Sequence, residues 1–313
     1  MQHFLPQDGK NLLGGIREGD FRSLARAITR VENNLPGTTE LLAALQNTGR
    51  TNVIGITGPP GAGKSTLVNA LVGHWLNKGR KIAVLAVDPS SPFNLGALLG
   101  DRIRLAGFYT HPHVFIRSLA SRGSLGGLHP AIMQITDLVR EAPFDFILVE
   151  TVGVGQSEIE IAGLADCTVV TLVPEAGDEV QAMKAGLMEI ADIFVVNKGD
   201  RPDADAMVRR IRNMAHERAQ EGIEAPVFKT IATEEKGIEA VAAAIAEKLS
   251  GKKGKNERQE HLQADKVLRL AIDLLLRDVS REQLTEDIRK ANFSGNRNVY
   301  QLAADLKEKI LKR

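Results

Sequence analysis

The stretch VIGITGPPGAGKSTLVNALVG, residues 53–73, decides the fold of this chain. It opens with an apolar, β-branched run and continues in a helical pattern, so residues 58–65 lie between a predicted strand and a predicted helix. These eight residues, GPPGAGKS, fill the pattern G-x-x-x-x-G-K-[ST]. Glycines in that pattern let backbone N–H groups wrap phosphate oxygens at a helix N-terminus. The sequence therefore predicts a P-loop.

The roles within this loop follow from the chemistry of its side chains. Lys64 is expected to reach the β- and γ-phosphates, and the Ser65 hydroxyl is expected to bind Mg²⁺. A P-loop alone does not separate a kinase, an ATPase and a GTPase. The predicted phosphate ligands are Gly58, Pro60, Gly61, Ala62, Gly63, Lys64, Ser65 and Thr66.

Around the P-loop, short β-branched runs alternate with longer helical patterns from residue 52 to about residue 249. Continuous apolar strands separated by helices indicate a mostly parallel sheet that is covered on both faces. The predicted fold is thus α/β, a doubly wound P-loop NTPase sheet flanked by helical extensions at both ends. The predicted strands are NVIGIT, KIAVLAVD, VFIRS, FDFILVET, CTVVTLV, DIFVVN and APVFKT.

Three regions are expected along the chain. Apolar residues three and four apart predict an N-terminal helical extension over residues 1–50, followed by the P-loop domain over residues 51–250. The polar stretch SGKKGKNERQE then begins a linker, and the amphipathic patterns after it predict a helical arm, together residues 251–313. These few helices cannot form a stable domain alone, so we expect them to pack on the body or on a second copy.

Composition excludes several partner classes. The 313 residues include 40 basic and 39 acidic side chains, a formal net charge of +1, so no global field attracts nucleic acid or an anionic membrane. One cysteine, Cys167 in an apolar run, favours a reducing compartment and a core position. No apolar window reaches the roughly 18 residues that a bilayer span needs. We expect a soluble, cytoplasmic protein.

The base is predicted by FVVNKGD, residues 194–200, which follows an apolar strand. Asn197, Lys198 and Asp200 match the N-K-x-D pattern of guanine-binding proteins. A carboxylate at Asp200 accepts two hydrogen bonds, from guanine N1–H and its exocyclic amine, whereas adenine offers no such pair of donors. Adenine would leave a buried charge unpaired, which is costly. The sequence therefore favours GTP and GDP.

Three carboxylates stand where strands end or a loop follows: Asp88, Asp101 and Glu150. The carboxyl ends of strands in a doubly wound sheet face the ligand, so we expect Asp88 and Glu150 to project toward Mg²⁺ and the γ-phosphate. Gly153 then offers an N–H to the γ-phosphate. Val154 follows it where Ras-like enzymes carry a water-orienting glutamine, which predicts slow hydrolysis that a partner accelerates. Gln156 is a weaker candidate for orienting water.

Several long motifs, in order, resemble the MeaB/ArgK/MMAA family, GTPases of the SIMIBI class that attend adenosylcobalamin-dependent methylmalonyl-CoA mutase. The resemblance covers about residues 11–250 and, more loosely, the C-terminal helices. The motifs are EGDFRSLARAITRVEN, GITGPPGAGKSTL, VDPSSPF with GALLGDRIR, VFIRSLASRGSLGGL, ILVETVGVGQSE and PEAGDEVQAMKAGLMEIADIFVVNKGD.

This resemblance implies a G-protein chaperone that binds the mutase, gates cobalamin transfer, and protects or restores the enzyme. It also implies a homodimer whose C-terminal helices embrace the other subunit. Lys64, Asp88, Asp101 and Glu150 match the family's catalytic positions. The expected magnesium ligands are Ser65, Asp88, Asp101 and Glu150. A segment that signals to the mutase matches at Gly177, Asp178, Glu179, Gln181 and Lys184.

The chain also departs from the family pattern. Asn94 and Leu95 stand in the first switch where a small hydroxyl residue and a glycine are usual. Ile231 replaces a usual serine, which leaves the Ala232 N–H as the expected contact to the guanine oxygen. The C-terminal region lacks a tryptophan near RQEHLQADKV, and relatives serve mutases for other branched acyl-CoAs.

Three other functions stay open. A nickel-inserting GTPase would need a His-rich tract or paired cysteines, and the chain offers HPH at residues 111–113 and Cys167. An ATP-dependent kinase of arginine-transport binding proteins conflicts with the N-K-x-D motif. A nucleotide-gated scaffold would work without hydrolysis. Trp75, on the helix after the P-loop, is expected in the core.

Overall fold

The computed structural model describes residues 7–46, 51–88, 105–121, 128–153, 157–175, 187–218 and 225–251, with separate residues from 264 onward. The chain forms two compact units, Met1–Gly251 and Lys252–Arg313. The first unit includes both the N-terminal helices and the sheet. Each unit is described by itself below.

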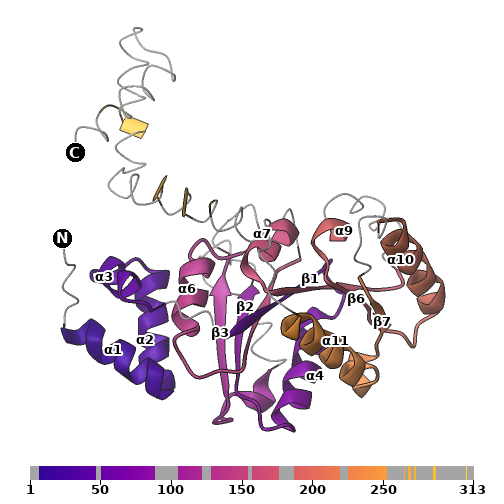
Figure 1. The fold of residues 1–313 in the computed structure, drawn as a ribbon, viewed down its shortest axis with the longest axis horizontal. Helices are drawn as coiled ribbons and strands as arrows, with labels where there is room; N and C mark the ends of the chain where they lie inside the picture. Colours follow the sequence, from indigo (N-terminus) through magenta and orange to yellow (C-terminus); the bar gives the residue numbers. More distant parts are fainter. Residues whose placement is uncertain are drawn as a thin grey trace. The chain divides into compact units, whose positions relative to one another are not determined.

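A seven-stranded sheet with the order β3-β2-β4-β1-β5-β6-β7 forms the centre of the first unit (Figure 1). All its strand pairings are parallel. Each strand coincides with one of the seven predicted runs, and β3 continues two residues further, so the predicted α/β fold is confirmed. The strands are β1 (Asn52–Thr57), β2 (Ile82–Asp88), β3 (Val114–Ala120), β4 (Phe146–Glu150), β5 (Cys167–Leu172), β6 (Ile193–Val196) and β7 (Val227–Lys229).

Helices cover both faces of this sheet, because the strands are apolar on both sides. One core cluster joins the sheet to α4 (Lys64–Leu76) and α11 (Ile238–Ser250). The other joins it to the remaining longer helices, which are α1 (Gln7–Glu18), α2 (Phe21–Glu32), α6 (Ile132–Val139), α7 (Ser157–Leu164) and α10 (Ala204–Arg218). The short elements are α3 (Thr38–Ala43), α9 (Leu187–Ile190), η1 (Ala106–Phe108) and η3 (Ala232–Glu234).

The N-terminal helices share the core of the sheet. Asp20 caps α2 by accepting hydrogen bonds from the backbone N–H groups of Arg22 and Ser23, and hydrogen bonds from Ser23 lower the pKa of Asp20. Phe21, at the start of α2, lies 5.5 Å from the ring of Phe115 on β3 and 5.9 Å from that of Phe144. These aromatic contacts fix α2 against the β3 side of the sheet.

Two residues singled out in the sequence are in the core. Trp75 is 4% exposed and its ring centroid lies 4.8 Å from that of Phe146, as expected for a packing residue. Cys167 at the start of β5 is fully buried, and this burial raises the pKa of its thiol to about 12.

Beyond residue 251 the structure describes a few helical residues. Among them Val267 and Leu268 are 66% and 59% exposed. The predicted role of this region in dimerisation stays a prediction. No helix in the described ranges is both long and apolar enough to cross a membrane.

The burial of Cys167 gives a direct test of the core. A thiol with a pKa of about 12 carries almost no thiolate at pH 8, and the thiolate is the reactive form. We expect no labelling of Cys167 in the native protein by a reagent that reacts through thiol–disulfide exchange. The urea-denatured chain should be labelled completely in the same time. Rapid native labelling would contradict the packing of β5.

Candidate functional site

The P-loop lies at the carboxyl end of β1, and two of its positions have no room for a side chain. Gly58 has φ +136°, and a Cβ there would lie 2.0 Å from the carbonyl oxygen of Thr171. Gly63 has φ +84°, and a Cβ there would lie 2.4 Å from Nδ2 of Asn197. Both positions therefore need glycine for space as well as for conformation.

Lys64 begins α4, and its side chain folds back over the loop. Its Nζ donates to the carbonyl oxygens of Gly58, at 2.9 Å, and Pro59, at 3.0 Å, and the residue is 6% exposed. An ammonium has three N–H groups, and these bonds direct two of them into the loop. The charge is thus held at the N-terminus of α4, where backbone N–H groups also favour an anion.

Gly153 closes the other side of this lysine. A Cβ on Gly153 would lie 2.4 Å from both Nζ of Lys64 and the carbonyl oxygen of Gly58, and the residue has φ +81°. The segment after β4 therefore contacts the P-loop directly. Gly153 therefore lies beside the loop that is predicted to bind the phosphates. The hydrogen bond from its N–H to the γ-phosphate stays a prediction.

Ser65 at the start of α4 and the carboxylates that end the neighbouring strands β2 and β4 lie at the carboxyl edge of the sheet. Ser65 Oγ donates to Oε1 of Glu150 at 2.6 Å, and Asp88 ends β2, the strand beside β4. Each of the three residues is at most 4% exposed. Oxygen ligands of this kind fit Mg²⁺. Within the described ranges no group of three or more His, Cys, Asp or Glu is placed to hold a metal.

Asn197 connects the P-loop to a second loop. Its Nδ2 donates to the carbonyl oxygen of Ala62 at 3.1 Å, while its Oδ1 accepts from Thr230 Oγ1 and from the Ala232 N–H, each at 3.1 Å. The Ala232 N–H, predicted to contact the guanine oxygen, thus donates to Asn197 in this structure. For the predicted contact, this N–H would have to be shared between Asn197 Oδ1 and the guanine oxygen. Sequence reasoning missed this bridging role of Asn197.

The remaining guanine-binding candidates follow β6. Lys198 has φ +55°, and Gly199 N–H donates to the Thr230 carbonyl at 2.8 Å, so the turn is tied to the same second loop. Asp200 is exposed in this structure, so the expected cost of an unpaired buried charge beside adenine applies only where the bound base itself covers the carboxylate. The next residue, Arg201, forms an ion pair with Glu175, and this hydrogen bond lowers the pKa of Glu175. The turn is therefore also connected to the segment that follows β5.

The other predicted residues lie outside the described ranges. They are Asp101, the first-switch residues Asn94 and Leu95, Val154 and Gln156, and the signalling residues Gly177, Asp178, Glu179, Gln181 and Lys184. Their predicted roles stay predictions. What the structure brings to one edge of the sheet is Lys64, Ser65, Asp88, Glu150, Gly153, Asn197 and Ala232.

Comparison with known proteins finds similarity to a family of GTPases. The model of a family described as methylmalonyl-CoA mutase-associated GTPase MeaB matches residues 24–285. A putative GTPase of Pyrococcus abyssi is 46% identical over 241 residues, 75% of this chain and 74% of its own length. The GTPase ArgK of Escherichia coli is 43% identical over 190 residues, 59% of this chain and 57% of its own length.

Two further proteins are informative. A fused isobutyryl-CoA mutase of Geobacillus kaustophilus is 35% identical over 258 residues, which are 77% of this chain but 24% of that protein. The crystal structure of a LAO/AO transport system kinase matches 98% of this chain and 99% of its own, with a TM-score of 0.66 and 26% identity.

The contact between Gly153 and Lys64 predicts the effect of Gly153→Ala. The added methyl group must displace either the lysine or the loop, so we expect nucleotide turnover to fall roughly 100-fold, as when a phosphate- or oxyanion-binding donor is lost. Gly79→Ala is the matched control, because Gly79 has φ +72° with nothing within 4 Å of the new Cβ. Equal turnover losses in both variants would attribute the effect to backbone strain alone.

Proposed function

The chain belongs to the MeaB family of methylmalonyl-CoA mutase-associated GTPases, and on that premise we propose that it is a GTP-hydrolysing chaperone of an adenosylcobalamin-dependent acyl-CoA mutase. In this role it gates loading of the cobalamin cofactor and protects or reactivates the mutase. The observation that carries the proposal is the family match over residues 24–285. The similarity to a fused isobutyryl-CoA mutase supports it, since that name joins a mutase to a region like this chain.

In the proposed reaction, the P-loop N–H groups and Lys64 hold the β- and γ-phosphates. Ser65, Asp88 and Glu150 hold Mg²⁺, with Asp101 as a further ligand from the first switch. The ion, when bound, neutralises charge on the phosphate oxygens. Ser65 Oγ, which donates to Glu150 Oε1 at 2.6 Å, would offer its oxygen to the ion, and the Glu150 carboxylate would balance the charge of the ion. Water attacks the γ-phosphate, and phosphate and GDP are the products.

Hydrolysis is slow in the chain alone, we propose, because Val154 follows Gly153 and offers no group to orient the attacking water. The N–H of Gly153 binds the γ-phosphate and is released when that phosphate leaves. Residues 177–184 transmit this change to the mutase. A partner that orients the water completes the site, so hydrolysis and partner binding become coupled.

Two alternatives from the sequence analysis, a kinase and a metal-delivery GTPase, are weighed against the structure. The likeness to a LAO/AO transport system kinase suggests phosphate transfer from ATP, but Asp200 selects guanine, so measuring GDP and ADP affinities separates the two. Metal delivery would use His111 and His113. The His113 N–H donates to Nδ1 of His111 at 3.2 Å, an interaction that a turn explains without a metal.

The central experiment compares turnover of GTP by the chain alone, with methylmalonyl-CoA mutase, and with isobutyryl-CoA mutase, using ATP as the control nucleotide. We expect slow GTP turnover that one mutase accelerates, and no turnover of ATP. Gel filtration of the same samples reports the proposed homodimer and its complex. Unchanged GTP turnover with both mutases, together with no complex, would argue against the chaperone role.

Base selection has its own test in Asp200→Asn. An amide replaces one acceptor by a donor, so it no longer matches the two guanine donors but does match xanthine, which carries a carbonyl in place of the amine. We expect GDP affinity to fall roughly 100-fold and affinity for xanthosine diphosphate to rise. Competition binding against a fluorescent nucleotide measures both. Retained guanine preference in the variant would remove Asp200 from the base site.

A further inference from the structure

The main chain at Asp88 has its lateral support from one neighbouring strand. Pairing between β2 and β4 ends with Ala86 beside Glu150, whereas pairing between β2 and β3 continues to Asp88 beside Ala120. The Ser121 N–H then donates to the Asp88 carbonyl oxygen at 2.9 Å. In the described ladder, the position of β3 therefore sets the position of the Asp88 backbone.

β3 is itself the edge strand of the sheet, with β2 as its strand neighbour. An edge strand lacks a second ladder to hold it, so its position depends on what packs against it from outside. Helix α2 supplies that packing through Phe21 against Phe115, and through a polar contact near the middle of the strand.

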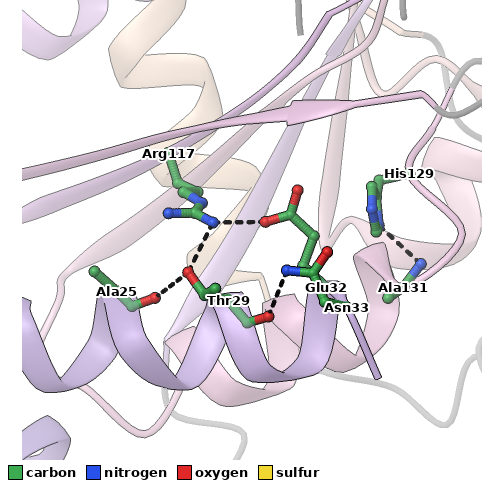
Figure 2. Close-up of polar contacts among 7 residues, drawn as sticks. All are labelled: Ala25, Thr29, Glu32, Asn33, Arg117, His129 and Ala131. Atoms are coloured by element: carbon green, nitrogen blue, oxygen red, sulfur yellow. Dashed lines mark hydrogen bonds and ion pairs between the residues drawn. The ribbon is translucent and has the colours of Figure 1, made fainter. Parts of the chain in front are cut away.

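The polar contact is made by Arg117, which lies beside Leu85 in the β2–β3 register. One nitrogen of its guanidinium, Nη2, donates to Glu32 Oε2 at 2.5 Å and to Thr29 Oγ1 at 3.1 Å, both on α2 (Figure 2). Thr29 Oγ1 in turn donates to the Ala25 carbonyl at 3.0 Å, so its lone pairs are available to accept from Arg117. The Arg117 and Glu32 side chains are 26% and 13% exposed, so water screens this pair only partly.

We propose that Arg117 and Glu32 are positioning residues for the magnesium site, because their ion pair fixes β3 and, through the β2–β3 ladder, Asp88. Arg117 is three residues from the level of Asp88 along the ladder, so the two side chains lie on opposite faces of the sheet. The influence therefore passes through the main chain and not through side-chain contact. The inference rests on the proposed function, since it takes Asp88 as a magnesium ligand.

The chain offers a matched control at the other end of the strands. Arg17 on α1 pairs with Glu141 at 2.7 Å, and Glu141 also accepts from the Gln46 N–H at 2.7 Å. This ion pair likewise attaches an N-terminal helix to the rest of the unit, but Glu141 lies in the connection between α6 and β4, before the amino end of β4 and away from Asp88. Loss of either ion pair weakens the attachment of the N-terminal helices. Only loss of the Arg117–Glu32 pair also removes a contact that holds β3, the strand beside Asp88.

The test is a Mg²⁺ titration of the dissociation rate of a fluorescent, non-hydrolysable GTP analogue from full-length protein. Arg117→Met keeps the aliphatic stem and removes the charge. We expect it to raise the Mg²⁺ concentration needed for half-maximal retention about fivefold, less than the 10- to 100-fold typical for a direct partner of a metal ligand. Arg17→Met should change this concentration less than about twofold while lowering the melting temperature comparably.

Glu32→Gln is the second variant, since it keeps the shape of the pair and serves if Arg117→Met fails to fold. It should shift the Mg²⁺ requirement in the same direction, and adding it to Arg117→Met should change nothing further, because both remove one interaction. If the Mg²⁺ concentration for half-maximal retention shifts equally in the Arg17 and Arg117 variants, or shifts in neither, the inference about Arg117 and Glu32 is overturned. The proposed function would still stand. Nucleotide retention by wild-type protein that ignores Mg²⁺ would overturn the magnesium site and the inference with it.

Discussion

The close approach of the P-loop backbone to the ends of β5 and β6 is the constraint on which the rest of the site depends. Gly58 lies against the Thr171 carbonyl, and Gly63 lies against the Asn197 amide. Because no side chain separates them, Asn197 reaches the Ala62 carbonyl and joins the phosphate loop to the loop of Thr230 and Ala232. The side-chain amide of Asn197 thereby connects the predicted phosphate-binding loop to the loop predicted to contact the base.

Much of this arrangement could be predicted because it is local in the sequence. Each strand is a continuous apolar run, the P-loop is a contiguous motif, and Asp88 and Glu150 end their strands, where a parallel sheet collects its ligand-facing groups. The contacts that were missed join distant segments. The Arg117–Glu32 pair spans 85 residues and the Asn197–Ala62 bond spans 135. Neither residue type nor spacing signals such a pair.

The N-terminal helices illustrate the same limit. Their helical periodicity is plain from the sequence, but periodicity does not say which surface an apolar stripe covers. In the structure Phe21 packs on Phe115 and Phe144, so α2 belongs to the same core as the sheet. Charge is also distributed unevenly: the chain is nearly neutral overall, yet Lys64, Asp88 and Glu150 are all buried at the carboxyl edge of the sheet. A neutral protein can thus concentrate its ionic chemistry in one place.

Helix α4 begins at Lys64 and carries Trp75, the single tryptophan of the chain, near its other end. Eleven residues of helix place the Trp75 backbone roughly 16 Å along the helix axis from Lys64, and the indole ring contacts Phe146. The protein therefore contains a built-in optical probe. Any tilt or rotation of α4 against the sheet alters the indole's surroundings and hence its emission, and such movement can be followed in the unlabelled wild-type chain.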